Sequence, residues 1–162
     1  MDKISLPYRL NVGAVLFSAD GRVFVGQRKG FSDSWQLPQG GVDDGENPHM
    51  AILRELQEEI GTNKAEIIGE HPEWLFYDLP SHLLGVAWGG KYRGQKQKWF
   101  ALRFTGADQD IRLDADAHPE FEAWQWVKLA DLPALAVAFK RDIYARLVQD
   151  FAPYVPAEKE IT

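Results

Sequence analysis

The sequence has no cysteine among its 162 residues, which excludes disulfide bonds, thiolate zinc sites and a cysteine nucleophile. It also has no uninterrupted apolar stretch long enough to cross a bilayer and no basic segment leading into an apolar one near its start, so neither a membrane span nor a secretory signal is expected. Basic residues are few, because 18 Lys and Arg stand against 24 Asp and Glu for a net charge of −6. This deficit argues against a protein that coats nucleic acid through a broad basic surface. We therefore expect a cytoplasmic enzyme or binding domain.

The composition is that of an ordinary globular protein. Apolar residues make up 45% and charged residues 26% of the chain, which are typical values. The length predicts one domain with a real core. We expect this domain to cover residues 1–162, with its core at about 8–151. The sequence does not determine the oligomeric state, and a monomer is compatible with it.

Hydrophobic patterning predicts a mixed sheet with two main helices packed on it, an α/β or α+β arrangement. The expected strands cover residues 8–17, 22–28, 65–79, 96–105 and 121–127. The first two are separated by the turn sequence Ala19-Asp20-Gly21 and should form a hairpin. Glycine-rich loops are expected at 30–45 and 85–94, and an amphipathic helix at 139–151.

A second helix is predicted between Asn47 and Gly61. Asn47 is a favourable N-cap and Pro48 suits the first helical position. Ile60 should end the helix, because Gly61 supplies the left-handed residue that commonly follows a helix.

This helix has two contrasting faces at 100° per residue. Three apolar residues share one side and should face the core: Leu53, Leu56 and Ile60. Three carboxylates share the opposite side: Glu55, Glu58 and Glu59. Arg54 can reach Glu58, but no Lys or Arg stands three or four positions from the other two. Such a face calls for an external cation such as Mg²⁺, which prefers oxygen ligands, although a solvated acidic surface is the better interpretation of an isolated glutamate cluster.

The residues around this helix follow a longer pattern, Gly-x5-Glu-x7-Arg-Glu-Leu-x-Glu-Glu-x-Gly. Its positions are Gly40, Glu46, Arg54, Glu55, Leu56, Glu58, Glu59 and Gly61. This pattern resembles the Nudix box, the signature of hydrolases acting on nucleoside diphosphates linked to another group. Thr62 departs from it, since the family usually has an aliphatic residue there. The resemblance implies the Nudix fold, in which a mixed β-sheet is sandwiched between helices.

The resemblance also implies roles for these residues. The carboxylates that bind Mg²⁺ or Mn²⁺, or act as bases linked to the metal, are Glu55, Glu58 and Glu59. Such a metal neutralises a pyrophosphate and lowers the pKa of a bound water. The residues that hold the helix and its loop in place are Glu46 and Arg54. Gly40 and Gly41 let the backbone approach metal or phosphate.

Four further segments narrow the resemblance: 35–41 (WQLPQGG), 94–100 (GQKQKWF), 119–121 (PEF) and 139–144 (FKRDIY). Together they resemble the bacterial RNA pyrophosphohydrolases and their relatives, the asymmetric diadenosine tetraphosphate hydrolases, over about residues 8–151. This resemblance implies that Glu120 is a fourth metal-binding carboxylate. Candidate phosphate contacts are Arg9, Arg28, Lys96, Lys98 and Lys140, because a polyphosphate needs fixed cations besides metal. Tyr77 and Phe139 are candidates to stack on a base, with core packing as the alternative.

Three functions are compatible with this pattern. The first is removal of pyrophosphate from the 5′ end of triphosphorylated or diphosphorylated RNA to leave a 5′ monophosphate, which would promote mRNA decay. The second is asymmetric hydrolysis of diadenosine tetraphosphate and related dinucleoside polyphosphates to ATP and AMP. The third is a non-catalytic binder of nucleotide ends, against which the complete glutamate set argues. The run at 139–144 and the short segment at 81–90 favour RNA.

Overall fold

The computed structural model describes residues 6–30 and 34–155. Within these residues the chain forms one eight-stranded sheet. The strands are β1 (Tyr8–Phe17), β2 (Val23–Arg28), β3 (Trp35–Gln36), β4 (Gln39–Gly41), β5 (Ala65–Glu70), β6 (Leu75–Asp78), β7 (Gly94–Phe104) and β8 (Phe121–Val127). The α-helices are α1 (Pro48–Ile60), α2 (Leu132–Leu135) and α3 (Arg141–Phe151). Short 3-10 turns include η2 (Ala87–Gly90), η3 (Asp108–Asp110), η4 (Leu129–Asp131), η5 (Ala138–Lys140) and η6 (Ala152–Tyr154).

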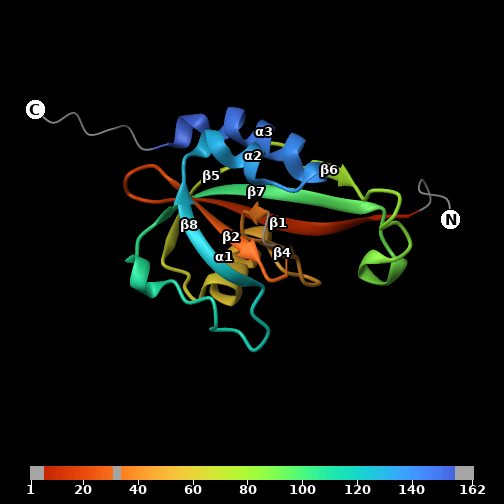
Figure 1. Cartoon of the computed structure of the whole chain (residues 1–162), viewed down its shortest axis with the longest axis horizontal. Helices are drawn as coiled ribbons and strands as arrows, with labels where there is room; N and C mark the ends of the chain where they lie inside the picture. The colour runs from red at the N-terminus through yellow and green to blue at the C-terminus, as the bar shows by residue number, and fades with distance from the viewer. Residues whose placement is uncertain (1–5, 31–33, 156–162) are drawn as a thin grey trace, which may run out of the picture.

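The centre of the sheet is a long parallel pair, β1 beside β7, in register from Tyr8 opposite Gly94 to Phe17 opposite Arg103. The main strand order is β3-β2-β1-β7-β5, with β4 also paired to β1, β6 to β7 and β8 to β2. Figure 1 shows α2 and α3 on one face of this sheet and α1 on the other. The expected mixed sheet between helices is therefore confirmed.

The core has two halves because successive residues of a strand point to opposite faces. Trp99 of β7 joins the half that packs on α3, together with Leu147. Phe100, the next residue, joins the half that packs on α1, together with Leu56. No helix in the described part of the chain is long and apolar enough to cross a membrane.

The strand predicted at 65–79 is in fact two strands, β5 and β6, both antiparallel to β7. The interruption lies at His71, which is buried and whose Nε2 lies 2.6 Å from Asp150 Oδ2 of α3. Pro72 follows and has no N–H to continue the ladder. A tertiary contact thus ends a strand that local pattern would have continued.

Three smaller predictions also change. The predicted hairpin is antiparallel, but its recorded register is limited to Phe17 opposite Val23, and the main partner of β2 is β8. The loop predicted at 30–45 contains β3 and β4, and its residues 31–33 lie outside the described residues. The helix predicted at 139–151 begins as η5, with regular α-helix from Arg141.

Candidate active site

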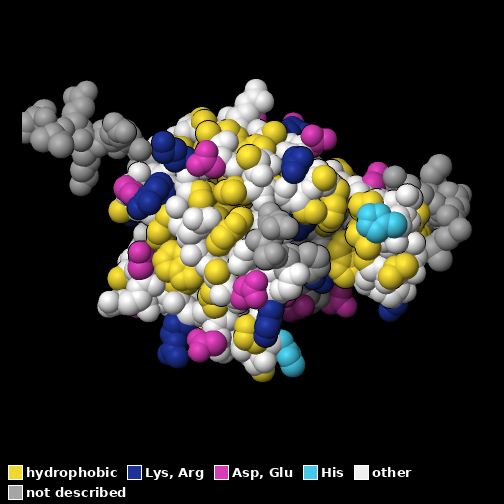
Figure 2. Space-filling view, in the orientation of Figure 1, with side chains coloured by type: hydrophobic (Ala, Val, Ile, Leu, Met, Phe, Trp, Pro, Cys, Tyr) yellow, Lys and Arg dark blue, Asp and Glu magenta, His cyan; other side chains and the backbone are white. Residues whose placement is uncertain are grey.

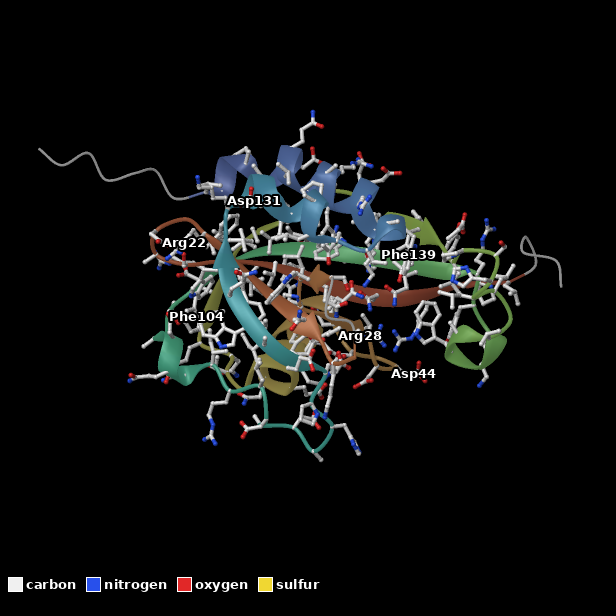
Figure 3. All side chains as sticks on the ribbon, in the orientation of Figure 1. Arg22, Arg28, Asp44, Phe104, Asp131 and Phe139 are labelled. Carbon is white, nitrogen blue, oxygen red and sulfur yellow. The ribbon has the colours of Figure 1, made fainter. Side chains whose placement is uncertain are left out.

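A cleft of about 910 Å³ is lined by residues of β1, β4, α1, η2 and η5. The predicted site residues that line it are Arg9, Arg28, Gly40, Gly41, Glu55, Glu58, Tyr77, Glu120, Phe139 and Lys140. In Figure 2 the loop that carries η2 stands beside the body of the molecule as a separate lobe. Figure 3 shows Arg28 and Phe139 in the half of the molecule away from Arg22 and Asp131. Segments distant in sequence therefore meet in one place.

Helix α1 starts and ends as predicted. The side chain of Asn47 accepts a hydrogen bond of 2.8 Å from the backbone N–H of His49, and Pro48 occupies the first turn. Gly61 closes the helix in the left-handed region with φ 77°. A Cβ there would lie 2.5 Å from the carbonyl oxygen of Arg112, so glycine is required on two grounds.

The orientation of α1 differs from the prediction. Its buried residues are Ala51, Ile52, Glu55, Leu56, Glu59 and Ile60, whereas Leu53 is only half-buried and Glu58 is exposed. The buried side therefore includes two of the glutamates expected opposite the core. Helix periodicity could not show this, because strand β4 packs over the end of the apolar stripe and encloses those carboxylates.

Arg54 connects the outer part of α1 to the preceding loop. Its guanidinium makes a bidentate pair with Glu46, at 2.7 and 2.9 Å, and donates to the carbonyl oxygen of Gly41 at 2.8 Å. Its Nη1 also donates to Glu55 at 2.9 Å and to Glu58 at 3.1 Å. The contact with Glu55, one residue along the chain, was missed by the sequence argument. Hydrogen bonds from Arg54 lower the pKa of Glu46 to about 2.

Glu59 is the opposite case. Its side chain is 3% exposed, and neither carboxylate oxygen has a hydrogen-bond partner among the described residues. Burial raises its pKa well above the ordinary value, the carboxylates of Glu120 and Glu55 raise it further, and the backbone of Gln39 and the charge of Lys140 oppose the rise without cancelling it. A buried ionised carboxylate in this position is costly unless something compensates its charge.

Glu55 lies between these two extremes. Burial raises its pKa to about 7, Arg54 opposes that rise, and Glu58 and Glu120 add to it. Gly40 packs directly against this side chain, since a Cβ at Gly40 would lie 1.9 Å from Glu55 Cδ. The glycine thus makes room for a carboxylate, in addition to any approach of backbone to ligand.

Glu120 reaches the same place from a distant segment. Its carbonyl oxygen accepts a 2.8 Å hydrogen bond from the backbone N–H of Lys29, which holds the start of β8 beside the end of β2. Its side chain is exposed in the cleft and is close enough to raise the pKa of both Glu55 and Glu59. The structure therefore brings the fourth predicted carboxylate close to Glu55 and Glu59.

Cations line the cleft opposite these carboxylates. Lys140 is 7% exposed, and burial with the charge of Arg28 lowers its pKa to about 8, against the attraction of Glu59 and Glu120. Arg9 lies over the Trp88 ring at 5.6 Å. Trp88 was not predicted as a site residue, because a tryptophan in a glycine-rich loop carries no distinctive spacing.

The aromatic candidates form a pair. The ring centroids of Tyr77 and Phe139 are 5.6 Å apart with planes tilted by 43°. Tyr77 is buried in the core and Phe139 is half-buried. Phe139 therefore offers the more accessible face, with Tyr77 behind it.

Two predicted phosphate contacts lie elsewhere. Lys96 Nζ lies 5.0 Å from the centroid of the Trp74 ring, and Lys98 Nζ lies 3.3 Å from Glu70 Oε1. Neither lysine lines the cleft. They alternate along β7 with Gln95 and Gln97 and so point to the other face of the sheet.

The donor set fits a hard divalent cation. In residues 6–30 and 34–155 no three His, Asp or Glu side chains form a ready-made metal cluster. The fit rests instead on Glu59, whose two buried oxygens lack partners, and on the space that Gly40 leaves around Glu55. Carboxylate oxygens are the ligands that Mg²⁺ and Mn²⁺ prefer.

Comparison with known proteins agrees with this geometry. The NUDIX domain model matches residues 7–147. A curated protein of Gluconacetobacter diazotrophicus named RNA pyrophosphohydrolase is 58% identical over 161 residues, covering 94% of this chain and 96% of the relative. One from Acidiphilium cryptum with the same name is 54% identical, covering 95% and 96%.

Solved structures share the fold. The E. coli dihydroneopterin triphosphate pyrophosphohydrolase superposes with a TM-score of 0.68 at 24% identity, covering 89% of this chain and 99% of that one. A C. elegans Ap4A hydrolase complex gives 0.63 at 23% identity, covering 90% and 98%. The resemblance drawn from residues 40–61 is confirmed, and the chain belongs to the Nudix hydrolase family.

Proposed function

We propose that this protein hydrolyses the 5′ end of triphosphorylated RNA, releasing pyrophosphate and leaving a 5′ monophosphate, with Mg²⁺ or Mn²⁺ as cofactor. The observation that carries the proposal is one cleft lined by Glu55, Glu58 and Glu120 together with the cations Lys140 and Arg9. Glu59 is buried close to Glu55 and Glu120, and its two carboxylate oxygens lack hydrogen-bond partners among the described residues. Curated relatives that cover nearly the whole chain bear the name RNA pyrophosphohydrolase. Their name supports RNA as the substrate class.

Four carboxylates would hold the metal: Glu55, Glu58, Glu59 and Glu120. When bound, the metal neutralises phosphate charge and lowers the pKa of a coordinated water. Hydrolysis breaks one phosphoanhydride bond, and water adds to phosphorus as pyrophosphate departs. Glu55, which packs against Gly40 and is oriented by Arg54, would accept the proton that the water loses.

The rest of the cleft would bind the substrate. Lys140, Arg9 and Arg28 are placed to contact phosphate oxygens that the metal leaves uncompensated. Phe139, supported by Tyr77, can stack on a base of the RNA. Since the net charge is −6, we expect recognition of the phosphorylated end of the RNA and of few phosphates beyond it.

Hydrolysis of dinucleoside polyphosphates is the second candidate. The same aromatic pair favours it, because a base stacked on Phe139 can belong to a nucleotide as well as to RNA. A solved C. elegans structure with this fold is titled an Ap4A hydrolase.

One assay tests the proposal: release of pyrophosphate or phosphate from 5′-triphosphorylated RNA beside cleavage of diadenosine tetraphosphate, both with Mg²⁺. We expect higher kcat/KM for the RNA. Faster cleavage of the dinucleotide would favour the second candidate. No turnover of either substrate would support a non-catalytic binder of nucleotide ends. In the Glu59→Gln variant, RNA with a 5′ hydroxyl should bind more weakly than the triphosphorylated form, with a shallow salt dependence.

A further inference from the structure

A chain of buried amides runs under the floor of the cleft. Gln97 of β7 is 1% exposed, and its Nε2 lies 2.8 Å from Gln95 Oε1. The same nitrogen lies 3.2 Å from Asn11 Oδ1 and 3.2 Å from Gln39 Oε1. Asn11, Gln39 and Gln95 line the cleft, whereas Gln97 does not. One hidden amide therefore contacts three amides that face the site.

Trp99 determines which way Gln97 points. Its indole Nε1 lies 3.1 Å from Gln97 Oε1. An indole N–H can only donate, so the atom of Gln97 that faces it must be the carbonyl oxygen. The indole can lie there because residue 13 of the neighbouring strand is glycine: a Cβ on Gly13 would lie 2.3 Å from the ring. The indole N–H therefore fixes the orientation of the Gln97 amide.

The orientation of Gln97 then determines that of the other three amides. Its NH2 nitrogen lies at hydrogen-bond distance from one atom of each of three side chains, and each of these atoms is the carbonyl oxygen because an amide nitrogen cannot accept a hydrogen bond. A reversed amide would place NH2 against NH2. The NH2 groups of Asn11, Gln39 and Gln95 must therefore point away from Gln97. Asn11 and Gln95 are almost fully buried and Gln39 is half-buried, and all three line the cleft, so their NH2 groups lie at its floor.

We propose that Gln97 and Trp99 are positioning residues that hold three amide NH2 groups, those of Asn11, Gln39 and Gln95, toward the cleft as donors to phosphate oxygens. This inference rests on the polyphosphate chemistry of the proposed function. Phosphate oxygens accept hydrogen bonds, so an outward carbonyl would repel them and an outward NH2 attracts them.

The test uses the full chain with Mg²⁺ and methylenediphosphonate, a diphosphate analogue whose bridging carbon prevents hydrolysis. In the wild-type protein we expect the side-chain NH2 signals of Asn11, Gln39 and Gln95 to shift in ¹⁵N–¹H NMR spectra on titration. Gln97→Met keeps length and removes the amide, and should weaken methylenediphosphonate binding about tenfold. Trp99→Phe keeps Gln97 but frees its orientation, and should weaken binding by a smaller factor. The control is Gln125→Met, at an exposed position on β8, with unchanged affinity expected.

The inference is wrong if wild-type NH2 signals stay fixed while backbone signals around Gly40 shift, or if folded Gln97→Met binds the analogue as tightly as wild type. Failure of the wild type to bind the analogue also overturns it. A purely structural role would lower the melting temperature of the variants and leave affinity unchanged. If the analogue results are as expected but triphosphorylated RNA is not hydrolysed, the proposed function alone fails. If Gln97→Met does not fold, the wild-type titration and Trp99→Phe still decide the matter.

Discussion

The carboxylates of helix α1 and its preceding loop lie in two contrasting environments. Around Arg54, the charges of Glu46 and Glu58 are balanced by hydrogen bonds within the chain. Around Glu59, the oxygens of a buried carboxylate have no hydrogen-bond partner in the described chain, and two more carboxylates outweigh the nearby Lys140. In the first region one guanidinium hydrogen-bonds three carboxylates and fixes the helix to its loop. In the second region a proton or an external cation would relieve the buried negative charge, so it is the part of the helix where a cation gains most.

Replacing Glu59 should produce the largest effect. Glu59→Gln keeps the shape and removes the charge, and the apolar face of α1 is unchanged. Loss of groups that merely orient metal ligands costs about 10- to 100-fold, so loss of a ligand should lower kcat for RNA by about 100-fold or more. Steady-state kinetics at saturating Mg²⁺ measure this. Turnover close to that of wild type would show that Glu59 is not part of the metal site.

The cations of the cleft come next. Arg9→Ala and Lys140→Met should each lower kcat/KM by roughly tenfold or more, since a hydrogen bond to a charged group contributes about 1.5–3 kcal/mol. Lys96→Ala is the matched control, because Lys96 lies outside the cleft near the Trp74 ring. A large loss of kcat/KM in Lys96→Ala, with no loss in the other two variants, would show that the substrate phosphates bind near Lys96 and not in the cleft.

Disrupting the Arg54 region should affect stability more than chemistry. Arg54→Lys keeps the charge but cannot make the bidentate pair with Glu46 or reach Gly41 at the same time. We expect the melting temperature to fall by roughly 3–10 °C, with the exposed contact to Glu58 contributing little. Arg103→Lys, whose pair with Glu66 is exposed on both sides, should change it by about 1–2 °C at most. Equal losses of melting temperature for Arg54→Lys and Arg103→Lys in calorimetry would show that the Arg54 contacts stabilise the fold no more than an exposed ion pair does.

The Glu59 region should also make stability depend on pH. Without divalent metal, folded Glu55 has a pKa of about 7 and that of Glu59 is raised well above the ordinary 4.5. The folded state therefore holds protons that the unfolded chain has released, and the free energy of unfolding should fall as the pH rises from about 5 to about 7. Glu46, with a pKa of about 2, acts below this window, and Lys140, with a pKa of about 8, acts above it. Urea unfolding in EDTA measures the slope, and Glu59→Gln should make it shallower, with the contribution of Glu55 remaining.

Sequence periodicity predicted the helix α1, its caps and the strands at its sides because these depend on neighbours along the chain. It placed Glu55 and Glu59 on the exposed side because it assumed that apolar residues alone face inward. Their burial depends on Gly40 and on strand β4, which pairs with β1. The motif, by contrast, named Glu55 and Glu58, which line the cleft, and Glu59, which is buried close to Glu55.

Two parts of the site could not be predicted for a similar reason. The amides of Asn11 and Gln39 meet Gln97 only through the pairing of β1 with β4 and β7, and single glutamines in strands have no distinctive spacing. Lys96 and Lys98 shared a motif with Gln95 and Gln97, but alternation along β7 sends them to the other face. Residues adjacent in a motif need not share a site.

The most direct test of the account is the effect of Mg²⁺ on thermal stability without substrate, in the wild-type protein and in Glu59→Gln. If a cation binds the Glu59 carboxylate, Mg²⁺ should raise the wild-type melting temperature in a concentration-dependent way. In Glu59→Gln the metal-free protein should be at least as stable as wild type at neutral pH, because folding no longer has to protonate a carboxyl group that is ionised in the unfolded chain, and Mg²⁺ should raise its melting temperature much less. Equal stabilisation of both proteins by Mg²⁺ would contradict the account.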